Sequence, residues 1–91
     1  MSSTQGVDIV IAEDSRIQAK ILERRLTEAG HRVRWGADGQ AALDLVREQA
    51  PEIIVSDIEM PTMTGYEFCK AVKQDSELRK IPFVLLSTLS D

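Results

Sequence analysis

Hydrophobic and polar positions along the chain alternate between short apolar runs and longer stretches of helical periodicity. Residues 7–12 form a nearly continuous apolar run rich in β-branched side chains, and residues 53–56 and 83–86 repeat the pattern. Such runs are typical of strands that are covered on both faces in a parallel sheet. Between the first two runs, Val33 and Trp35 alternate with arginines, which predicts a short, half-solvated strand with Trp35 packed at a sheet edge.

Three stretches between these strands have the periodicity of amphipathic helices. The first begins at Ser15, whose spacing to Gln18 fits a capping box, and ends near Gly30. The third begins at a second capping box, made by Thr64 and Glu67. The apolar residues expected to share one face of each helix are Ile17, Ile21, Leu22, Leu26 and Ala29, then Ala41, Ala42, Leu45 and Val46, then Phe68, Cys69 and Val72.

Strands and helices alternate throughout, which predicts an α/β fold with an open parallel sheet and helices on both faces. In such sheets ligands bind beyond the carboxyl ends of the strands. The residues that follow the strands are therefore the candidates for chemistry.

Composition and charge exclude several classes of protein. The chain has 91 residues, of which 43% are apolar, enough for one globular domain and too few for two. Fifteen acidic residues outnumber eleven Lys and Arg, and the formal charge of −4 argues against direct binding of nucleic acid. The single Cys69 can form neither an internal disulfide nor a cysteine-based metal site.

The start of the chain and the lengths of its apolar runs bear on its location. Residues 1–6 form a polar leader that we expect to be disordered, with residues 7–91 as the folded domain. The leader lacks the charged and apolar regions of a signal peptide, and no apolar run approaches the ~20 residues that span a bilayer. We therefore expect a cytoplasmic protein that does not bind membranes.

Acidic and hydroxyl side chains follow three of the apolar strands. Glu13 and Asp14 come after the first, Asp57 after the third, and Ser87 with Thr88 after the fourth. Carboxylates that converge repel one another and favour a bound cation. Because the ligands are oxygen atoms, with no His or Cys nearby in the sequence, Mg²⁺ is the expected ion and Mn²⁺ the alternative.

These residue types suit phosphoryl transfer. A carboxylate can attack phosphorus and form an aspartyl phosphate. Asp57 fits this role because it stands alone on a central strand, with the acidic pair on one neighbouring strand and Ser87 on the other. Glu13 and Asp14 would then hold the metal, which neutralises charge on the transferring group.

Three segments carry a resemblance to a known family. They are residues 9–15 (IVIAEDS), residues 54–61 (IVSDIEMP) with Gly65, and residues 81–87 (IPFVLLS). In this order, each at a strand end, they resemble the successive signatures of the receiver domain of bacterial two-component response regulators, over residues 7–91. The fold that the resemblance implies is the flavodoxin-like doubly wound sheet of strand order 2-1-3-4-5.

The resemblance also implies roles for individual residues. Asp57 matches the phosphoacceptor, which takes a phosphoryl group from the histidine of a sensor kinase or a phosphotransfer protein and thereby switches a downstream output. Asp14 matches the acid that ligates Mg²⁺ directly, and Glu13 the acid that reaches it through water. The backbone carbonyl of Glu59 would supply a further ligand.

The segment after the fourth strand is where the chain departs from the family pattern. Ser87 matches the hydroxyl that contacts the phosphoryl group, with Thr88 as the weaker candidate. Receiver domains continue through a fourth helix, a fifth strand ending in a lysine and a fifth helix, which these 91 residues lack. Because Lys70, Lys73 and Lys80 precede the fourth strand, they cannot replace that lysine. We therefore expect an incomplete receiver that associates with itself through the edge of its fourth strand.

Two alternative functions remain open at this point. Haloacid-dehalogenase-like phosphatases also use an Asp nucleophile after an apolar strand, Mg²⁺ and a later Ser or Thr. Their signature is Asp-x-Asp, whereas this chain has Asp57-Ile58-Glu59, and their acidic pair follows the nucleophile rather than preceding it. A receiver-like module that binds partners without being phosphorylated is the other alternative. The favoured interpretation is a phosphoacceptor that assists its own phosphorylation and is not a turnover enzyme.

Overall fold

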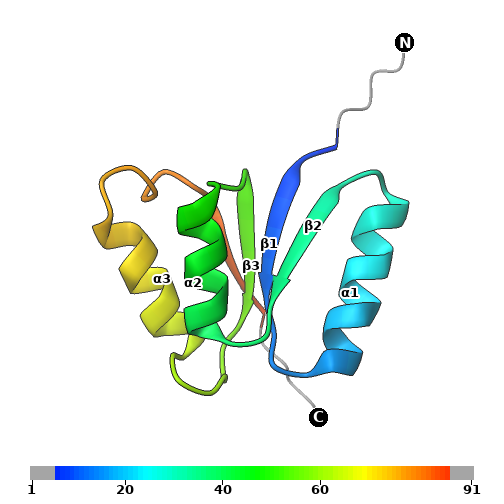
Figure 1. Cartoon of the computed structure of the whole chain (residues 1–91), viewed down its shortest axis with the longest axis horizontal. Coiled ribbons are helices and arrows are strands. Elements are labelled where there is room, and N and C mark those ends of the chain that lie inside the picture. Colours follow the sequence, from blue (N-terminus) through cyan, green and yellow to red (C-terminus); the bar gives the residue numbers. More distant parts are fainter. Residues whose placement is uncertain (1–5, 87–91) are drawn as a thin grey trace.

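The computed structural model describes residues 6–86, which form a parallel sheet flanked by helices (Figure 1). The strands are β1 (Asp8–Ala12), β2 (Arg32–Gly36), β3 (Ile53–Asp57) and β4 (Phe83–Leu86). Their order is β2-β1-β3-β4, so β1 and β3 are central and the other two strands are the edges of the described sheet. This order equals the first four positions of the flavodoxin-like sheet and confirms the fold expected from the sequence.

Three helices connect the strands: α1 (Arg16–Glu28), α2 (Gly39–Glu48) and α3 (Gly65–Gln74). Figure 1 shows α2 and α3 on one face of the sheet and α1 on the opposite face. Each connection between parallel strands thus passes over one face of the sheet, as parallel pairing requires. Within residues 6–86, no helix is both long enough and apolar enough to cross a membrane.

Side-chain caps fix where all three helices begin, and the caps of α1 and α3 are the ones that the sequence predicted. The hydroxyl of Ser15 accepts a hydrogen bond from the backbone N–H of Gln18, at 3.2 Å. At Thr64 both bonds of the capping box with Glu67 are present. These caps satisfy N–H groups that have no partner within the helix. The α1 cap follows the end of β1 closely, whereas a longer loop separates the end of β3 from the α3 cap.

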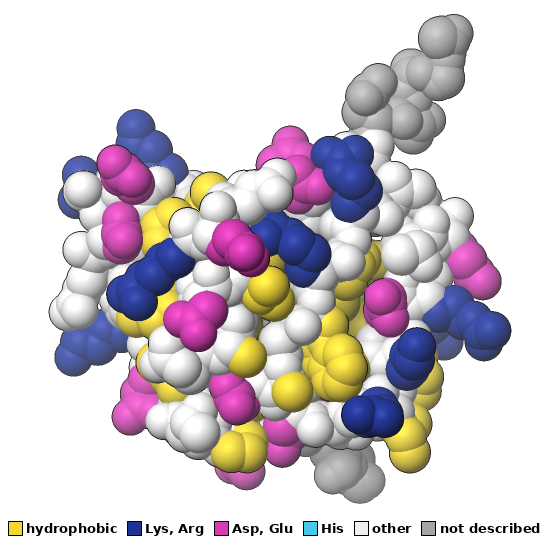
Figure 2. Space-filling view, viewed as in Figure 1, with side chains coloured by type: hydrophobic (Ala, Val, Ile, Leu, Met, Phe, Trp, Pro, Cys, Tyr) yellow, Lys and Arg dark blue, Asp and Glu magenta, His cyan; other side chains and the backbone are white. Residues whose placement is uncertain are grey.

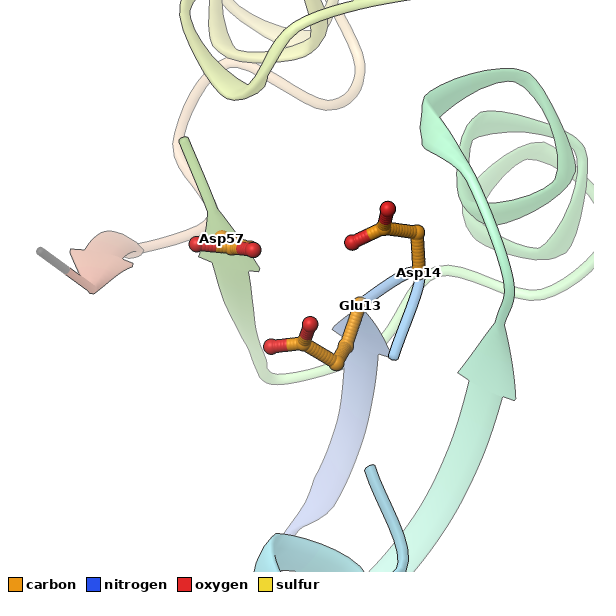
Figure 3. A group of neighbouring side chains, drawn as sticks. All are labelled: Glu13, Asp14 and Asp57. Carbon is orange, nitrogen blue, oxygen red and sulfur yellow. The ribbon is translucent and has the colours of Figure 1, made fainter. Parts of the chain in front are cut away.

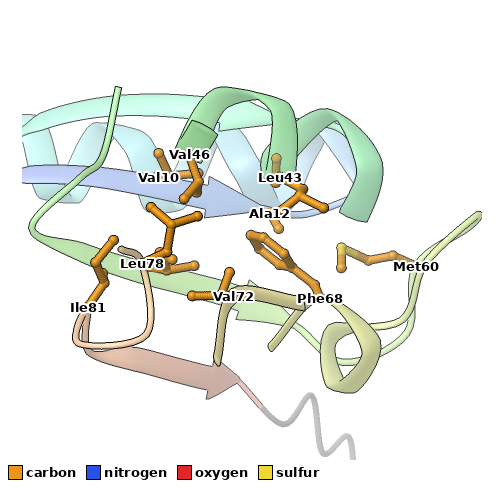
Figure 4. Packing of buried hydrophobic residues seen from close by; sticks show 11 residues of the cluster. Val10, Ala12, Leu43, Val46, Met60, Phe68, Val72, Leu78 and Ile81 are labelled. Carbon is orange, nitrogen blue, oxygen red and sulfur yellow. The ribbon is translucent and has the colours of Figure 1, made fainter. Parts of the chain in front are cut away.

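The main hydrophobic core lies between the sheet and the pair α2 and α3 (Figure 4). Phe68 is completely buried there, and its ring packs edge-to-face against Phe83 with the ring centroids 5.1 Å apart. Leu43 belongs to this core, although the sequence pattern did not single it out. The cluster consists of Val10, Ala12, Ala42, Leu43, Val46, Ile54, Met60, Phe68, Val72, Leu78 and Ile81.

The helix on the other face of the sheet packs less completely than its sequence suggests. Only Ala19 of α1 is buried, while Ile17 and Ile21 are 72% and 47% exposed. The sequence pattern grouped these isoleucines with Leu22 and Leu26, which are half-buried. The apolar positions of α1 spread too widely around the helix for β1 and β2 to cover them all.

The fourth strand is also more exposed than the buried strand that its apolar run predicts. Val84 is 40% exposed, and the other residues of β4 are half-buried. Val84 pairs with Val55, which in turn pairs with Ile11, so all three side chains point to the α1 face of the sheet. Because α1 packs against β1 and β2, this side of β3 and β4 keeps apolar surface in contact with solvent.

Charged side chains of both signs lie on the face of the molecule drawn in Figure 2. Figure 2 shows acidic and basic groups interspersed over one face of the molecule. Proteins that bind nucleic acid without sequence preference present a continuous basic surface instead. The face in Figure 2 shows no such continuous basic surface, and the absence of direct nucleic-acid binding stays a prediction.

Replacing Phe68 by alanine is expected to lower the free energy of unfolding by about 3 to 5 kcal/mol, because it removes a fully buried ring and leaves a cavity. Urea denaturation followed by far-UV circular dichroism measures the change. The control is Tyr66→Ala in the same helix, where the side chain is 62% exposed, and a change within about 0.5 kcal/mol is expected. Equal losses in the two variants would contradict the placement of Phe68 in the core.

Candidate functional site

Three carboxylates lie together beyond the carboxyl ends of the two central strands (Figure 3). Glu13, Asp14 and Asp57 each offer an oxygen atom within 4.8 Å of those of the other two. The sheet register brings them together, because β1 and β3 run in parallel with Ala12 opposite Ser56. Glu13 and Asp57 are the next residues along the two strands and therefore emerge side by side.

Burial differs among the three acids, and backbone N–H groups orient two of them. Glu13 and Asp57 are only 6% and 8% exposed, whereas Asp14 is exposed to solvent. Glu13 Oε2 accepts a hydrogen bond from the N–H of Ser15 at 3.1 Å. Asp57 Oδ1 accepts one from the N–H of Ile58 at 2.9 Å. The two buried carboxylates therefore each have one oxygen fixed by the chain that leaves the strand.

The electrostatics of the site are most evident at Glu13. Burial raises the pKa of this carboxyl above its usual value near 4.5, and the N–H of Ser15 partly opposes the shift. The neighbouring charges of Asp57 and Asp14 raise the pKa further. Ionised Glu13 thus opposes folding at neutral pH, and a cation among the three carboxylates would relieve that strain.

The loop from β3 to α3 closes tightly over the end of the strand. A Cβ atom on Gly65 would lie 2.2 Å from the carbonyl oxygen of Asp57, so only glycine allows this approach. Within the loop, Thr62 has a φ of 66°, and Met63 N–H donates to the carbonyl of Pro61 at 2.7 Å. A β-branched residue in this left-handed region is strained, and surrounding contacts must hold it there.

The donor chemistry fits a hard divalent cation. All three side chains present carboxylate oxygens, the ligands that Mg²⁺ and Mn²⁺ prefer. Mg²⁺ commonly binds one or two carboxylates and keeps positions for water and phosphate oxygens. A cluster with one exposed and two buried acids at a strand end suits that mode of binding.

The structure brings together some of the residues that the sequence singled out and leaves the others untested. Glu13, Asp14 and Asp57 form the cluster, and their roles as metal ligands and phosphoacceptor remain predictions. The side chain of Glu59 is exposed, and the role of its backbone carbonyl also remains a prediction. Ser87 and Thr88 lie outside the described residues.

One residue at the site was missed by the sequence analysis. Trp35 of β2 donates a hydrogen bond from its indole Nε1 to the backbone carbonyl of Glu13, at 2.7 Å. The hydrophobic pattern predicted a strand residue packed at an edge and gave no sign of this bond. A backbone acceptor has no side-chain signature in the sequence, so no motif could have revealed it.

Comparison with known proteins decides the family. The family model of the response regulator receiver domain matches residues 9–91. The chain belongs to this family. The match confirms the resemblance found in the sequence and favours a receiver over the phosphatase alternative.

Two regulators illustrate the relationship in sequence. The chain is 33% identical over 82 residues to the polar-differentiation response regulator DivK of Brucella anthropi, covering 90% of this chain and 67% of that protein. It is 36% identical over 83 residues to the transcriptional regulatory protein AfsQ1 of Streptomyces coelicolor, covering 91% of this chain. This receiver spans only 36% of AfsQ1 and 32% of a probable transcriptional regulator from Guillardia theta.

Solved structures agree with the architecture. The signal receiver domain of a signal transduction histidine kinase from Syntrophus aciditrophicus matches with a TM-score of 0.88 at 38% identity, covering 94% of this receiver and 65% of that chain. The chemotaxis response regulator CheY4 of Vibrio cholerae matches with a TM-score of 0.88 at 33% identity, covering 97% of this receiver and 72% of that chain. The sheet and helices described above are thus those of a receiver domain.

Replacing Glu13 by glutamine is expected to raise the free energy of unfolding at pH 7, without added divalent cation, because it removes a buried charge close to two other carboxylates. The pKa of Glu13 is raised in the folded state, so its contribution to stability is fully present below about pH 4.5 and is lost as the pH rises through the folded pKa. Glutamine removes this loss and can still accept the N–H of Ser15. Urea denaturation at several pH values measures the gain, which should shrink toward zero below about pH 4.5.

The control for this pH series is Glu77→Gln, which changes an exposed acid remote in sequence from the cluster. It should leave the pH dependence of stability unchanged. A Glu13→Gln variant with the same pH profile as the native chain would contradict the electrostatic strain assigned to the site.

Proposed function

We propose that this receiver accepts a phosphoryl group on Asp57 in a Mg²⁺-dependent step of two-component signalling. The observation that carries the proposal is the convergence of Glu13 and Asp14 on Asp57 at the ends of the central strands. The family match supplies the context, because receivers accept phosphoryl groups from histidine kinases or phosphotransfer proteins. The same chemistry would make this protein a phosphoacceptor that switches an output, not an enzyme with turnover.

Asp57 is the nucleophile in this proposal. Oδ1 of Asp57 keeps the hydrogen bond that it accepts from the N–H of Ile58. The other carboxylate oxygen attacks the phosphorus of a phosphohistidine. The new bond joins phosphorus to the aspartate oxygen, and the P–N bond breaks with its electron pair returning to the imidazole nitrogen. Low exposure of Asp57 limits the access of water to the acyl phosphate that results.

The acidic pair would hold the metal ion. Asp14 would bind it directly, Glu13 through a water molecule, and the backbone carbonyl of Glu59 would add a ligand; Mn²⁺ could replace Mg²⁺. When bound, the ion neutralises charge on the transferring phosphoryl group. Glu13 is suited to an indirect contact because its Oε2 is already held by the N–H of Ser15.

The remaining proposed features concern contacts and location. Ser87, or less suitably Thr88, would donate a hydrogen bond to a phosphoryl oxygen from the end of the fourth strand. The direct partners would be a sensor histidine kinase or a phosphotransfer protein, rather than nucleic acid or a membrane. We place the protein in the cytoplasm, where such partners expose their phosphohistidines.

Incubation with a small acyl-phosphate donor and MgCl₂ should add one phosphoryl group to the chain, detected by intact-protein mass spectrometry. Asp57→Asn should abolish the addition because the amide is not a nucleophile for this step. The matched control is Asp44→Asn, an exposed aspartate on α2, which should be labelled like the native chain. The adduct should also be lost on mild alkaline treatment, as acyl phosphates are.

The outcomes separate the three candidate functions. Labelling that persists in Asp57→Asn would place the nucleophile elsewhere. Continuous release of phosphate from the donor over many turnovers would favour a phosphatase. Absence of labelling and of any response to MgCl₂ would favour a module that binds partners without being phosphorylated.

We further propose that the 91-residue chain associates with itself through β4. β4 is an edge of the described sheet, and an apolar edge strand is a template for pairing with another chain. Val84 on this strand is 40% exposed, and Ile17 and Ile21 add exposed apolar surface on the same face of the sheet. A second copy that pairs with β4 would cover part of this surface.

Light scattering across a concentration series is expected to show a mass that rises above that of the monomer at micromolar concentration. Val84→Lys should shift the equilibrium toward monomer, because it places a charge on the exposed side of the edge strand. Tyr66→Lys alters an exposed side chain on α3, away from the strand edge, and should leave the association unchanged. A compact monomer at high micromolar concentration would refute this proposal.

A further inference from the structure

A tryptophan on the neighbouring edge strand reaches the backbone of the acidic site. Trp35 lies opposite Ile11 in the pairing of β1 with β2, so its side chain is on the α1 face of the sheet. From there its indole Nε1 donates to the carbonyl oxygen of Glu13 at 2.7 Å. The bond joins residues that are 22 positions apart in the sequence.

The end of β2 holds both backbone groups of Glu13. The N–H of Glu13 donates to the carbonyl of Gly36 at 3.1 Å, and its C=O accepts from Trp35. The first bond continues the pattern of the sheet, but the second comes from a side chain at the point where β1 has ended. Through Trp35, the hydrogen bonding between β2 and the β1 segment thus continues for one peptide group beyond the sheet pattern.

That peptide group connects the two metal-binding candidates. The C=O of Glu13 and the N–H of Asp14 belong to one planar unit, so fixing the carbonyl also fixes the direction in which the chain enters Asp14. Asp14 is exposed and has little packing of its own to restrain it. The position of its carboxylate relative to Glu13 and Asp57 therefore depends on the backbone that precedes it.

We propose that Trp35 is a positioning residue of the acidic site, whose indole N–H sets the Glu13–Asp14 peptide for binding of a divalent cation. This inference rests on the proposed function, since it assumes that the cluster binds Mg²⁺. Packing of the ring at the sheet edge accounts for a bulky side chain at this position. It does not require the N–H to point at Glu13, because a ring without a donor could also cover the sheet edge.

The single tryptophan of the chain allows the N–H to be tested by itself. Biosynthetic replacement of Trp35 by β-(3-benzothienyl)alanine exchanges the N–H for sulfur and retains the bicyclic ring. Replacement by 4-fluorotryptophan keeps the N–H and is the matched control. The probe is MgCl₂, and the dissociation constant comes from the amide NMR shifts of Asp14 and Asp57, with the free energy of unfolding measured separately.

Loss of one hydrogen bond of this kind is expected to weaken binding of Mg²⁺ about 3- to 10-fold in the benzothienyl protein. The fluorotryptophan protein should bind within about 2-fold of the native chain, because a hydrogen bond is retained. In the metal-free state, the amide signal of Asp14 should move in the benzothienyl protein, since its N–H shares the peptide that Trp35 holds. Trp35→Phe should reproduce both effects and serves as the second variant if the analogue does not fold.

Several results would overturn the inference. One is an unchanged dissociation constant in both donor-free proteins. Another is equal weakening by 4-fluorotryptophan, which would assign the effect to ring packing. A native chain with no saturable response to MgCl₂ would instead refute the proposed metal site. The proposed role of Trp35 in binding the metal would then be refuted as well.

Discussion

The parallel pairing of β1 with β3 is the constraint on which the rest of the molecule depends. Val10 and Ile54 are completely buried and lie opposite each other, which fixes the register of the two strands. Because the side chains of a strand alternate between faces, a slip of one residue would turn Ile54 away from the core that it shares with Val10. The same register sets Glu13 beside Asp57, so the hydrophobic core determines the geometry of the acidic site.

The acidic site works against the stability that this pairing provides. Two carboxylates less than a tenth exposed, with a third close by, are unfavourable without a counter-ion. The chain offsets part of this cost with backbone N–H groups at the start of the loops, which donate to one oxygen of Glu13 and one of Asp57. Thr62 adds a strained backbone on the loop after Asp57. Such costs are typical of sites that are held ready for a ligand.

Much of this arrangement could be predicted from the sequence, for identifiable reasons. The apolar runs ending in Ala12 and Ser56 are short and sharply bounded, so the acids after them had to lie at strand ends. Helix starts at Ser15 and Thr64 carry side-chain caps with a known spacing. These signals are local in the sequence, and local signals were sufficient to find the strands, the helices and the acidic cluster.

The features that the sequence did not reveal depend on what lies opposite each residue. Periodicity identifies Ile17 and Ile21 as apolar, but it does not indicate that α1 covers only two strands. In the same way, alternation placed Trp35 on an edge strand without indicating that its N–H meets the carbonyl of Glu13. Both features depend on contacts between distant parts of the chain. For Trp35 the partner is a backbone carbonyl, which any residue could supply.

The weak anchoring of α1 has a consequence for motion at the acidic site. With Ala19 as its only buried residue, this helix should open in local fluctuations that cost far less free energy than global unfolding. Asp14 lies one residue before the cap of that helix, whereas Glu13 and Asp57 sit at the ends of the best-buried strands. The cluster therefore joins two rigid groups to one that moves with α1. A change in how firmly α1 packs on the sheet would alter the site by displacing one carboxylate, that of Asp14.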